Sequence, residues 1–308
     1  MISAWTTKGT GIFFLLALIS LAATWTYMFQ FFFYSYRQWK ATASYGLPVS
    51  LDSISLWLHD TSLFDSAWRQ VSVGDWQWLW SHQLCSLTVS VWTPILAIEG
   101  HRRQIPFIWA YMLLGQVVAI SFASSLAFAV ILAYPASKEP SDDLLKRIVL
   151  CIVGGLGTVV LSPFVAKGEG FMLNLLTMHI LLILPLFQTK TSSTKQPMVI
   201  MMIYVFASGA NLMIYLQQWY QCLSSLSSFW PSTILEQLIT VFFHHPAQSS
   251  ISSDIVCMQL ITMTWIWIHR RTPYALPLLV MTPLLSASVT LPLFFSLMEY
   301  QKQHKLKQ

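Results

Sequence analysis

The sequence predicts an all-α membrane protein, a polytopic bundle of about eight transmembrane helices, seven to nine, with amphipathic helices at the membrane surface. Of the 308 residues, 55% are hydrophobic and only 9% are charged, whereas charged residues make up about a quarter of soluble domains. The apolar residues form runs of about 20, the helix length that crosses a hydrocarbon core roughly 30 Å thick. We therefore expect one integral membrane domain over residues 1–308.

The apolar runs set the expected spans in chain order. The first run follows Lys8, is too long for a signal peptide and has no small-residue cleavage site after it, so we expect a retained transmembrane helix. The expected spans are residues 11–34, 78–98, 105–134, 148–166, 171–187, 198–216, 255–268 and 274–297. With these spans the basic residues divide seven against ten between the two sides, which does not set the orientation.

Two connecting segments are long enough to have structure of their own. Residues 35–77 predict a short helix capped by Ser50 or Asp52 and a second one ending near Val71, both in the membrane interface, where tryptophan is favoured. Residues 217–253 contain an apolar stretch, 234–243, that is too short to span. It predicts either a re-entrant helix or a helix lying flat on the membrane.

Charge and cysteine spacing also limit the classes of partner that we expect. The net charge of +5 fits contacts with anionic lipid head groups better than nucleic-acid binding, because no basic soluble domain is present. The expected partners are therefore the lipid bilayer and a small molecule, with no nucleic acid. The four cysteines are widely spaced and predict small core residues rather than a disulfide framework or a metal site.

Motifs that hold metal ions are missing from the sequence. Asp142 and Asp143 are adjacent, but the third acid of an Asp-rich magnesium motif is absent, and the pair suits the start of a helix. His244 and His245 stand alone among eight scattered histidines. We therefore expect no metal ion and no other cofactor, which disfavours diphosphate chemistry.

Residues 57–99 combine six of the 14 tryptophans with four of the 12 carboxylates. Acids among aromatic rings suit chemistry that generates a cation on an apolar substrate, because ring faces attract positive charge. Ionisable residues in or beside a span are costly in hydrocarbon, so each is a functional candidate. The candidate acids are Glu99, Asp60, Asp65 and Asp254. The plainer alternatives are an interfacial acid neutralised by arginines at Glu99, and helix caps at the three aspartates.

Other side chains are expected to assist the acid. Arg102 and His82 are expected to tune it, and Asp254 or Asp65 to support it. We expect the remaining candidates to line a cavity or stabilise a cation: Trp57, Trp68, Trp80, Trp92, Gln83, Tyr111 and Gln116. For Trp80 a place in an aromatic interface belt is an equal alternative, and polar residues inside spans commonly serve only as interhelical hydrogen bonds.

Four segments carry a resemblance to a known family. They read WLHDTSLFDSAW (57–68), WLWSHQLC (78–85), AIEGHRR (97–103) and WAYMLLGQ (109–116). This pattern resembles the fungal membrane-bound terpene cyclases of meroterpenoid pathways, typified by the ascochlorin and ascofuranone cyclases. The similarity covers roughly residues 50–135, and the remainder agrees only in size and hydropathy.

The resemblance implies an isomerase-type or lyase-type cyclase of secondary metabolism in the endoplasmic reticulum membrane. Such enzymes cyclise a farnesyl chain on a polyketide-derived aromatic, usually after a separate epoxidase has acted, and they start by protonation without a metal. Glu99 or Asp60 is our expected proton donor. The alternative is a membrane protein that binds or transports a lipid or sterol without chemistry. Two carboxylates within reach of one buried point favour the enzyme, and a through-going polar path favours transport.

Overall fold

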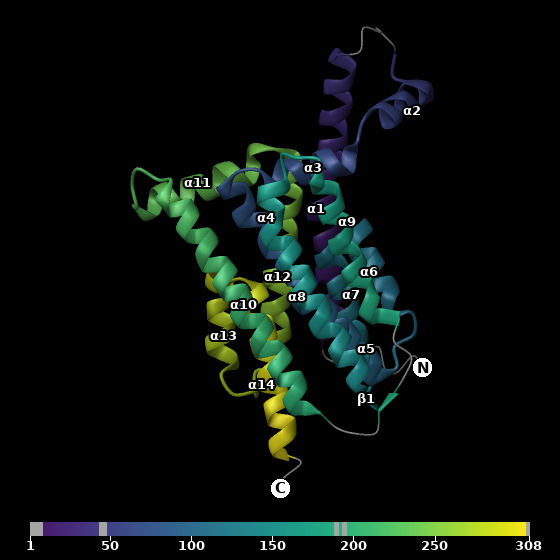
Figure 1. The fold of residues 1–308 in the computed structure, drawn as a ribbon, viewed down its shortest axis with the longest axis vertical. Coiled ribbons are helices and arrows are strands. Elements are labelled where there is room, and N and C mark those ends of the chain that lie inside the picture. The colour runs from purple at the N-terminus through teal and green to yellow at the C-terminus, as the bar shows by residue number, and fades with distance from the viewer. Residues whose placement is uncertain (1–8, 43–47, 188–190, 193–195, 306–308) are drawn as a thin grey trace.

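The computed structural model describes residues 9–42, 48–187, 191–192 and 196–305, and this part of the chain is almost entirely helical (Figure 1). The predicted all-α class is confirmed. The elements are α1 (Thr10–Thr42), α2 (Leu51–Asp60), α3 (Leu63–Ser72), α4 (Asp75–Leu87), the π-helical turn η2 (Thr88–Trp92), α5 (Thr93–Arg103), α6 (Ile108–Val117), α7 (Ile120–Ala133), β1 (Glu139–Pro140), α8 (Asp142–Val165), α9 (Gly170–Ile183), the 3₁₀ turn η3 (Leu184–Phe187), β2 (Thr191–Ser192), α10 (Pro197–Ser224), α11 (Pro231–His244), α12 (Pro246–Ile268), α13 (Ala275–Leu285) and α14 (Ala287–Lys305). β1 and β2 form a short antiparallel pair.

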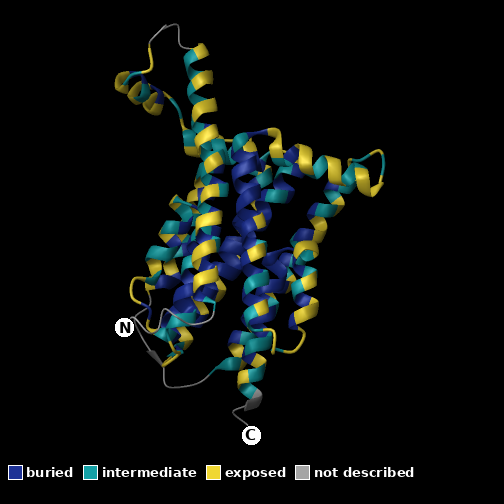
Figure 2. Cartoon of the chain, turned by 180° about the vertical axis from the view of Figure 1, so that it is seen from behind, coloured by how far each residue is buried: buried dark blue, intermediate teal, exposed yellow. Residues whose placement is uncertain are grey.

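The axis of the bundle is one continuous helix made of α4, η2 and α5. Every residue from 81 to 102 is buried, so neighbouring helices surround this segment on all sides (Figure 2). The hydroxyl side chains of this segment donate hydrogen bonds to backbone carbonyls of the same helix. Thr88 Oγ1, for example, donates to the Leu84 carbonyl at 2.6 Å. The π turn precedes Pro94, which has no N–H to donate, and the Thr88 carbonyl accepts both the backbone N–H and the Oγ1 hydroxyl of Thr93. The expected span 78–98 is therefore present and longer than predicted.

Long apolar helices surround this axis. Within the described residues, five helices are long and apolar enough to cross a membrane: α1, α8, α9 with η3, α10 and α12. Their outer faces carry exposed apolar side chains, among them Leu18, Leu150, Leu173 and Met213, as expected of helices that meet lipid. α1 packs along α7 and α12, α8 along α9, and α10 along α14.

The expected span 105–134 does not cross the bundle. It folds into two short antiparallel helices, α6 and α7, of 10 and 14 residues, which are only about 15 and 21 Å long. A Cβ placed on Gly115 would lie 3.5 Å from the Cβ of Ala123, whereas eight residues of a straight helix span about 12 Å. The chain therefore reverses at Val118 and Ala119 and returns to the side from which it came.

The expected span 274–297 likewise does not cross the bundle but folds into two helices, α13 and α14. The hydroxyls of Thr282 in α13 and Thr290 in α14 lie 3.0 Å apart, so these two helices also run antiparallel. The reversal occurs at Ser286, whose φ of 74° lies in the left-handed region that non-glycine residues rarely adopt. Both hairpins lie below α3 and α11 in Figure 1 and enter from the same end. Re-entrant structure is thus present, but not at 217–253, where one of the two predictions placed it.

The end of the bundle that carries α2, α3 and α11 is called the upper end (Figure 1). α2 begins and α3 ends where predicted, and the Ser50 hydroxyl accepts from the Ser53 amide as the cap of α2. α1 extends to Thr42, so the interfacial segment is shorter than 35–77. α11 connects the upper ends of α10 and α12 and lies across the bundle with Leu235, Ile239 and Phe243 exposed. The flat-helix alternative is therefore the one that the structure bears out for 234–243.

The hairpins change the charge balance between the two ends. Of the basic side chains in the described residues, the lower end carries Arg102, Arg103, Lys138, Lys146, Arg147, Arg270, Arg271 and Lys302, and the upper end carries Arg37, Lys40, Arg69 and Lys167. Because lysine and arginine concentrate in cytoplasmic loops, this asymmetry predicts a cytoplasmic lower end. With eight full crossings, as expected from hydropathy, the basic residues would be divided almost evenly between the two ends.

Candidate functional site

A large cavity, with a volume of about 410 Å³, lies within the described part of the chain. It lies between the middle of α1, the roof helix α3, the tip of the α6–α7 hairpin, α9 and the upper half of α12. Three of the candidate residues predicted from sequence line it: Asp254, Gln116 and Trp68. Its other walls are mainly apolar and aromatic, which is typical of a site for an oily ligand.

Asp254 is the acidic residue that lines this cavity. It is 6% exposed, and its two carboxylate oxygens accept hydrogen bonds from the backbone amides of Ile120 at 3.0 Å and Ser121 at 2.8 Å. These amides form the first turn of α7, whose N-terminus lies inside the bundle because the hairpin reverses there. Asp254 is therefore a cap, as one prediction held, but it caps α7 rather than its own helix. The α7 dipole and two N–H groups stabilise negative charge on it.

The hairpin tip is held by contacts from the neighbouring helices. The Trp25 indole donates from Nε1 to the Val118 carbonyl at 3.1 Å. Gly115 allows α6 and α7 to approach closely, because a Cβ there would lie 3.0 Å from Cδ1 of Ile120. Gln116 Nε2 is buried and has no hydrogen-bond partner within the described residues. The tip thus fixes the Asp254 carboxyl group of α12 at the cavity wall and adds an unpaired amide donor beside it.

An aromatic roof covers the upper side of the cavity. In α3, Phe64 and Trp68 pack edge to face at 6.5 Å, and His179 of α9 approaches them at 5.7 and 6.5 Å between ring centroids. α3 is amphipathic, with Asp65 and Arg69 paired at 2.7 Å beside the apolar face. It is the second of the two interfacial helices that the sequence predicted. His179, Trp25, Phe31, Phe32 and Phe64 were not predicted as site residues, because only tertiary packing brings them to one cavity.

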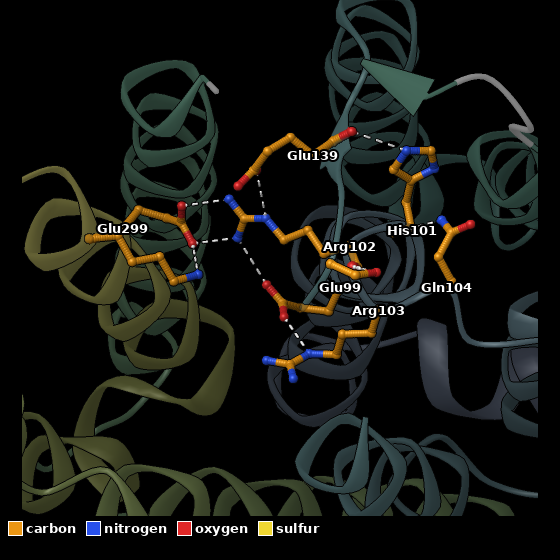
Figure 3. Close-up of polar contacts among 9 residues, drawn as sticks. Glu99, His101, Arg102, Arg103, Gln104, Glu139 and Glu299 are labelled. Carbon is orange, nitrogen blue, oxygen red and sulfur yellow. Dashed lines mark hydrogen bonds and ion pairs between the residues drawn. The ribbon is translucent and has the colours of Figure 1, made fainter. Parts of the chain in front are cut away.

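A second group of predicted residues lies at the lower end of the bundle, in an ion-pair cluster (Figure 3). Arg102, 3% exposed, forms a bidentate pair with Glu299 at 2.6 and 2.7 Å. It also binds Glu99 at 3.0 Å and Glu139 at 3.2 Å. Arg103 donates to the other Glu99 oxygen at 2.9 Å, and Lys302 donates to Glu299 at 2.8 Å. The three acids and three bases balance, and they tie α5, β1 and α14 together.

This cluster does not suit Glu99 as the proton donor. Both of its carboxylate oxygens accept hydrogen bonds from arginine, and these interactions stabilise the ionised form. A separate cavity of about 250 Å³ lies beside it, lined by Glu99, Glu299 and His269 among others. The interfacial acid neutralised by arginines is the alternative that fits this geometry. Glu299, Glu139 and Lys302 were not predicted as site residues, although an acid at the end of the otherwise apolar 287–299 segment pointed to Glu299.

His82 and Arg102 do not act on one group, although both were expected to tune the acid. They lie twenty positions apart on the same continuous helix, a separation of about 30 Å. His82 is buried, with Nδ1 2.8 Å from the Trp78 carbonyl, and Gln83 donates to the Leu79 carbonyl at 2.7 Å. Each side chain hydrogen-bonds to its own helix, and neither lines the large cavity; the buried Nε2 of His82 has no hydrogen-bond partner within the described residues.

Trp57 and Asp60 lie on α2, above the bundle. The Trp57 indole donates to the Ser35 hydroxyl, and Asp60 is exposed and accepts from the Trp39 indole at 3.0 Å. Hydrogen bonds from His59 first, and from Trp39, lower the pKa of the Asp60 carboxyl. A carboxyl that stays ionised in water is a poor proton donor at neutral pH, so the geometry argues against Asp60 as the acid.

The remaining aromatic candidates lie away from the cavity. Trp80 packs edge to face on Phe242 at 5.4 Å, where α11 meets α4. Trp92 is fully buried in the π turn against Phe128, and Tyr111 is half-buried on α6. The four cysteines are buried and unpaired, as predicted. The tryptophan-rich run 57–99 is therefore not one site, because it extends from above the bundle to the opposite end.

Comparison with known proteins yields one partial similarity. Residues 203–300 match the family described as protein of unknown function DUF2834. The matched part includes most of α10, then α11 to α13 and most of α14, and so contains Asp254 and Glu299 but not Glu99 or Arg102. Neither the curated proteins nor the solved structures contain a match.

Proposed function

We propose that this protein is a membrane terpene cyclase that starts its reaction by protonation, with Asp254 as the proton donor. The observation that supports it is a single buried carboxyl group in a 410 Å³ aromatic-walled cavity, with two backbone donors aimed at its oxygens. The volume falls within the roughly 300–1,000 Å³ of small-molecule sites. The residues quoted above for the family resemblance include Trp68 and Gln116, which line this cavity.

In the proposed reaction, burial in the apolar cavity keeps Asp254 neutral, because its partners are uncharged amides rather than the arginines that ionise Glu99. Asp254 transfers its proton to the oxygen of a terminal epoxide or to a terminal alkene carbon. The amides of Ile120 and Ser121 then stabilise the carboxylate that forms, and they need no reorganisation because the hairpin already holds them in place. The cation moves along the chain as rings close. The reaction ends when a substrate hydroxyl attacks the cation and loses its proton, or when a neighbouring carbon releases a proton; in either case the Asp254 carboxylate accepts the proton, so that the acid is regenerated.

The cavity walls suit a cationic intermediate. Trp68, Phe64 and Trp25 line the cavity, and an aromatic face contributes about 2 kcal/mol or more to a desolvated cation. The substrate class that we propose is a farnesyl chain, epoxidised or with its terminal alkene, on a polyketide-derived aromatic. An epoxidase would act before this protein, and the endoplasmic reticulum membrane is the proposed location.

Expression in a host without the pathway tests the proposal directly. Cells are fed a farnesylated phenol and its terminal epoxide, and cyclised products are measured by mass spectrometry. Asp254→Asn should lower turnover at least about a hundredfold, since positioned acids contribute 10²–10⁴. Asp60→Asn, an exposed aspartate remote from the cavity, is the matched control and should retain activity. The absence of any cyclised product with well-expressed wild-type protein would overturn the cyclase proposal.

Two further variants separate chemistry from folding. Trp68→Leu should lower turnover at least about tenfold, because it removes an aromatic face from the cavity. Trp80→Leu is the control and should keep its turnover, because it removes a tryptophan outside the cavity. Glu99→Gln should keep the turnover of the folded fraction. Loss of turnover in Glu99→Gln at unchanged stability would place the acid in the lower cluster instead.

Binding or transport of a lipid or sterol without chemistry is the second candidate. Two observations favour it: the large cavity contains only one carboxylate among its described lining residues, and two half-spanning hairpins end inside the bundle. Transporters commonly place their sites at such broken helices. In this case the fed isoprenoid would be recovered unchanged with the purified protein, and Asp254→Asn would alter the amount bound.

A further inference from the structure

A second large cavity, of about 350 Å³, lies at the upper end of the bundle and takes no part in the proposed reaction. It is formed by the turn before α4, the end of α8 and the upper part of α10. Its polar wall includes Asp75, Lys167, Gln217 and Gln221. Ser72 also lines it and is 1% exposed, and its hydroxyl has no hydrogen-bond partner within the described residues.

The two charged groups of this cavity do not neutralise each other. Asp75 and Lys167 both line it, yet within the described residues neither forms an ion pair. A simple anion would be repelled by Asp75, and a simple cation by Lys167. The cavity is therefore complementary to a group that carries both charges, a phosphate for Lys167 and Ser72 and an ammonium for Asp75.

The cavity lies at the level of the lipid head groups. Trp76 and Trp219 pack edge to face at 6.1 Å at this end of the bundle, as in an aromatic interface belt. Lys167 follows directly after the apolar α8, which ends at Val165. Below the polar wall the lining continues with Val160 and Phe164, 48% and 74% exposed, on the lipid-facing side of α8. The ligand must therefore be polar at one end and apolar at the other.

We propose that this cavity binds the head group of a zwitterionic phospholipid, with its acyl chains along Val160 and Phe164. The phosphate lies against Lys167 and Ser72, the ammonium lies against Asp75, and the α10 glutamines contact the remaining polar atoms. The inference does not depend on the proposed cyclase activity, because the cavity is separate from the one that contains Asp254.

Native mass spectrometry of the purified full chain tests this site. The probes are dioleoyl phosphatidylcholine, phosphatidylethanolamine and phosphatidylglycerol, diacylglycerol without a head group, and free glycerophosphocholine. The two zwitterionic lipids should bind at least about tenfold more tightly than diacylglycerol, a difference of about 1.4 kcal/mol. Free glycerophosphocholine should not displace them, since it has no chains to lie on α8.

Charge variants assign the binding to this cavity. Lys167→Gln should weaken phosphatidylcholine and phosphatidylglycerol alike, whereas Asp75→Asn should weaken only the zwitterionic lipids, each by about tenfold. Lys138→Gln and Asp143→Asn, which change exposed charges at the lower end, are the matched controls. Equal binding of phosphatidylcholine and diacylglycerol, tighter binding of phosphatidylglycerol by wild type, or unchanged binding by both cavity variants would overturn the proposal.

Discussion

Replacing Glu299 with glutamine should destabilise the protein more than any comparable change at a surface ion pair. The substitution removes one negative charge from a balanced cluster, while the Arg102 guanidinium stays 3% exposed and loses a bidentate partner at 2.6 and 2.7 Å. Breaking a buried ion pair by removing one partner costs about 3–5 kcal/mol. Glu99 and Glu139 remain hydrogen-bonded to Arg102 at 3.0 and 3.2 Å, so we expect a loss of about 3 kcal/mol, the smallest value in this range.

Two control variants calibrate this magnitude. Asp143→Asn removes the partner of Arg147 in a pair whose side chains are 53% and 46% exposed, and such pairs contribute about 0–1 kcal/mol. Glu139→Gln should lie between the two, because the Glu139 side chain is 27% exposed and contacts Arg102 through one bond at 3.2 Å. The expected order of destabilisation is therefore Glu299→Gln, then Glu139→Gln, then Asp143→Asn.

The cysteines supply the assay. Cys85, Cys151, Cys222 and Cys257 are free and buried, so a thiol-reactive dye reports unfolding of detergent-solubilised protein during heating. A chain of this size loses about 2 °C of Tm per kcal/mol, so Glu299→Gln should lower the Tm by about 6 °C. Asp143→Asn should stay within about 2 °C of wild type.

A Tm of Glu299→Gln within about 2 °C of wild type would refute the structural role, since the cluster would then contribute little to holding α14 against α5. A variant that keeps its Tm but loses all cyclase turnover would refute it as well. That result would mean that the lower carboxylates serve the chemistry. A lowered Tm with normal turnover of the folded fraction is the outcome that the structural role requires.

The remaining predictions concern orientation and the first hairpin. In sealed vesicles with the cytoplasmic face outward, an impermeant thiol reagent should label Lys138→Cys at once and Lys167→Cys only after permeabilisation; the reverse pattern would invert the orientation. Gly115→Val should lower stability by about 1–3 kcal/mol, because its Cβ would lie 3.0 Å from Ile120 and force α6 away from α7. Gly157→Ala is its control, since nothing lies within 4 Å of an added Cβ there, and an equal loss of Tm in both variants would refute the close-approach argument.

Much of the architecture follows from the sequence because hydrophobic burial in a bilayer depends on local composition. Apolar runs of sufficient length identified every helix that lies in the bundle, and the Ser50 cap and the amphipathic face of α3 were readable from a few adjacent residues. The same reasoning identified Asp254 as a residue of interest, because an acid at the start of an apolar helix is costly unless it has partners.

The path of each apolar run through the membrane was not readable in this way. A run that crosses and a run that reverses at Val118 or Ser286 have the same composition, so hydropathy counted both hairpins as spans. The reversal depends on the close approach at Gly115 and on the pairing of Thr282 with Thr290, which are tertiary contacts. The error carried over to the charge count, since the false crossing at 105–134 moved the basic residues from Lys138 to Arg271 to the wrong side.

The sequence by itself therefore determined that this is a helical membrane protein, where its apolar segments lie, and which acids needed an explanation. Only the tertiary structure decided their roles. It placed Asp254 at the tip of α7 beside the large cavity, and Glu99 among arginines at the opposite end. The physical reason is that the partner of a buried charge is chosen by packing between helices distant in sequence, and no local pattern of residues records that choice.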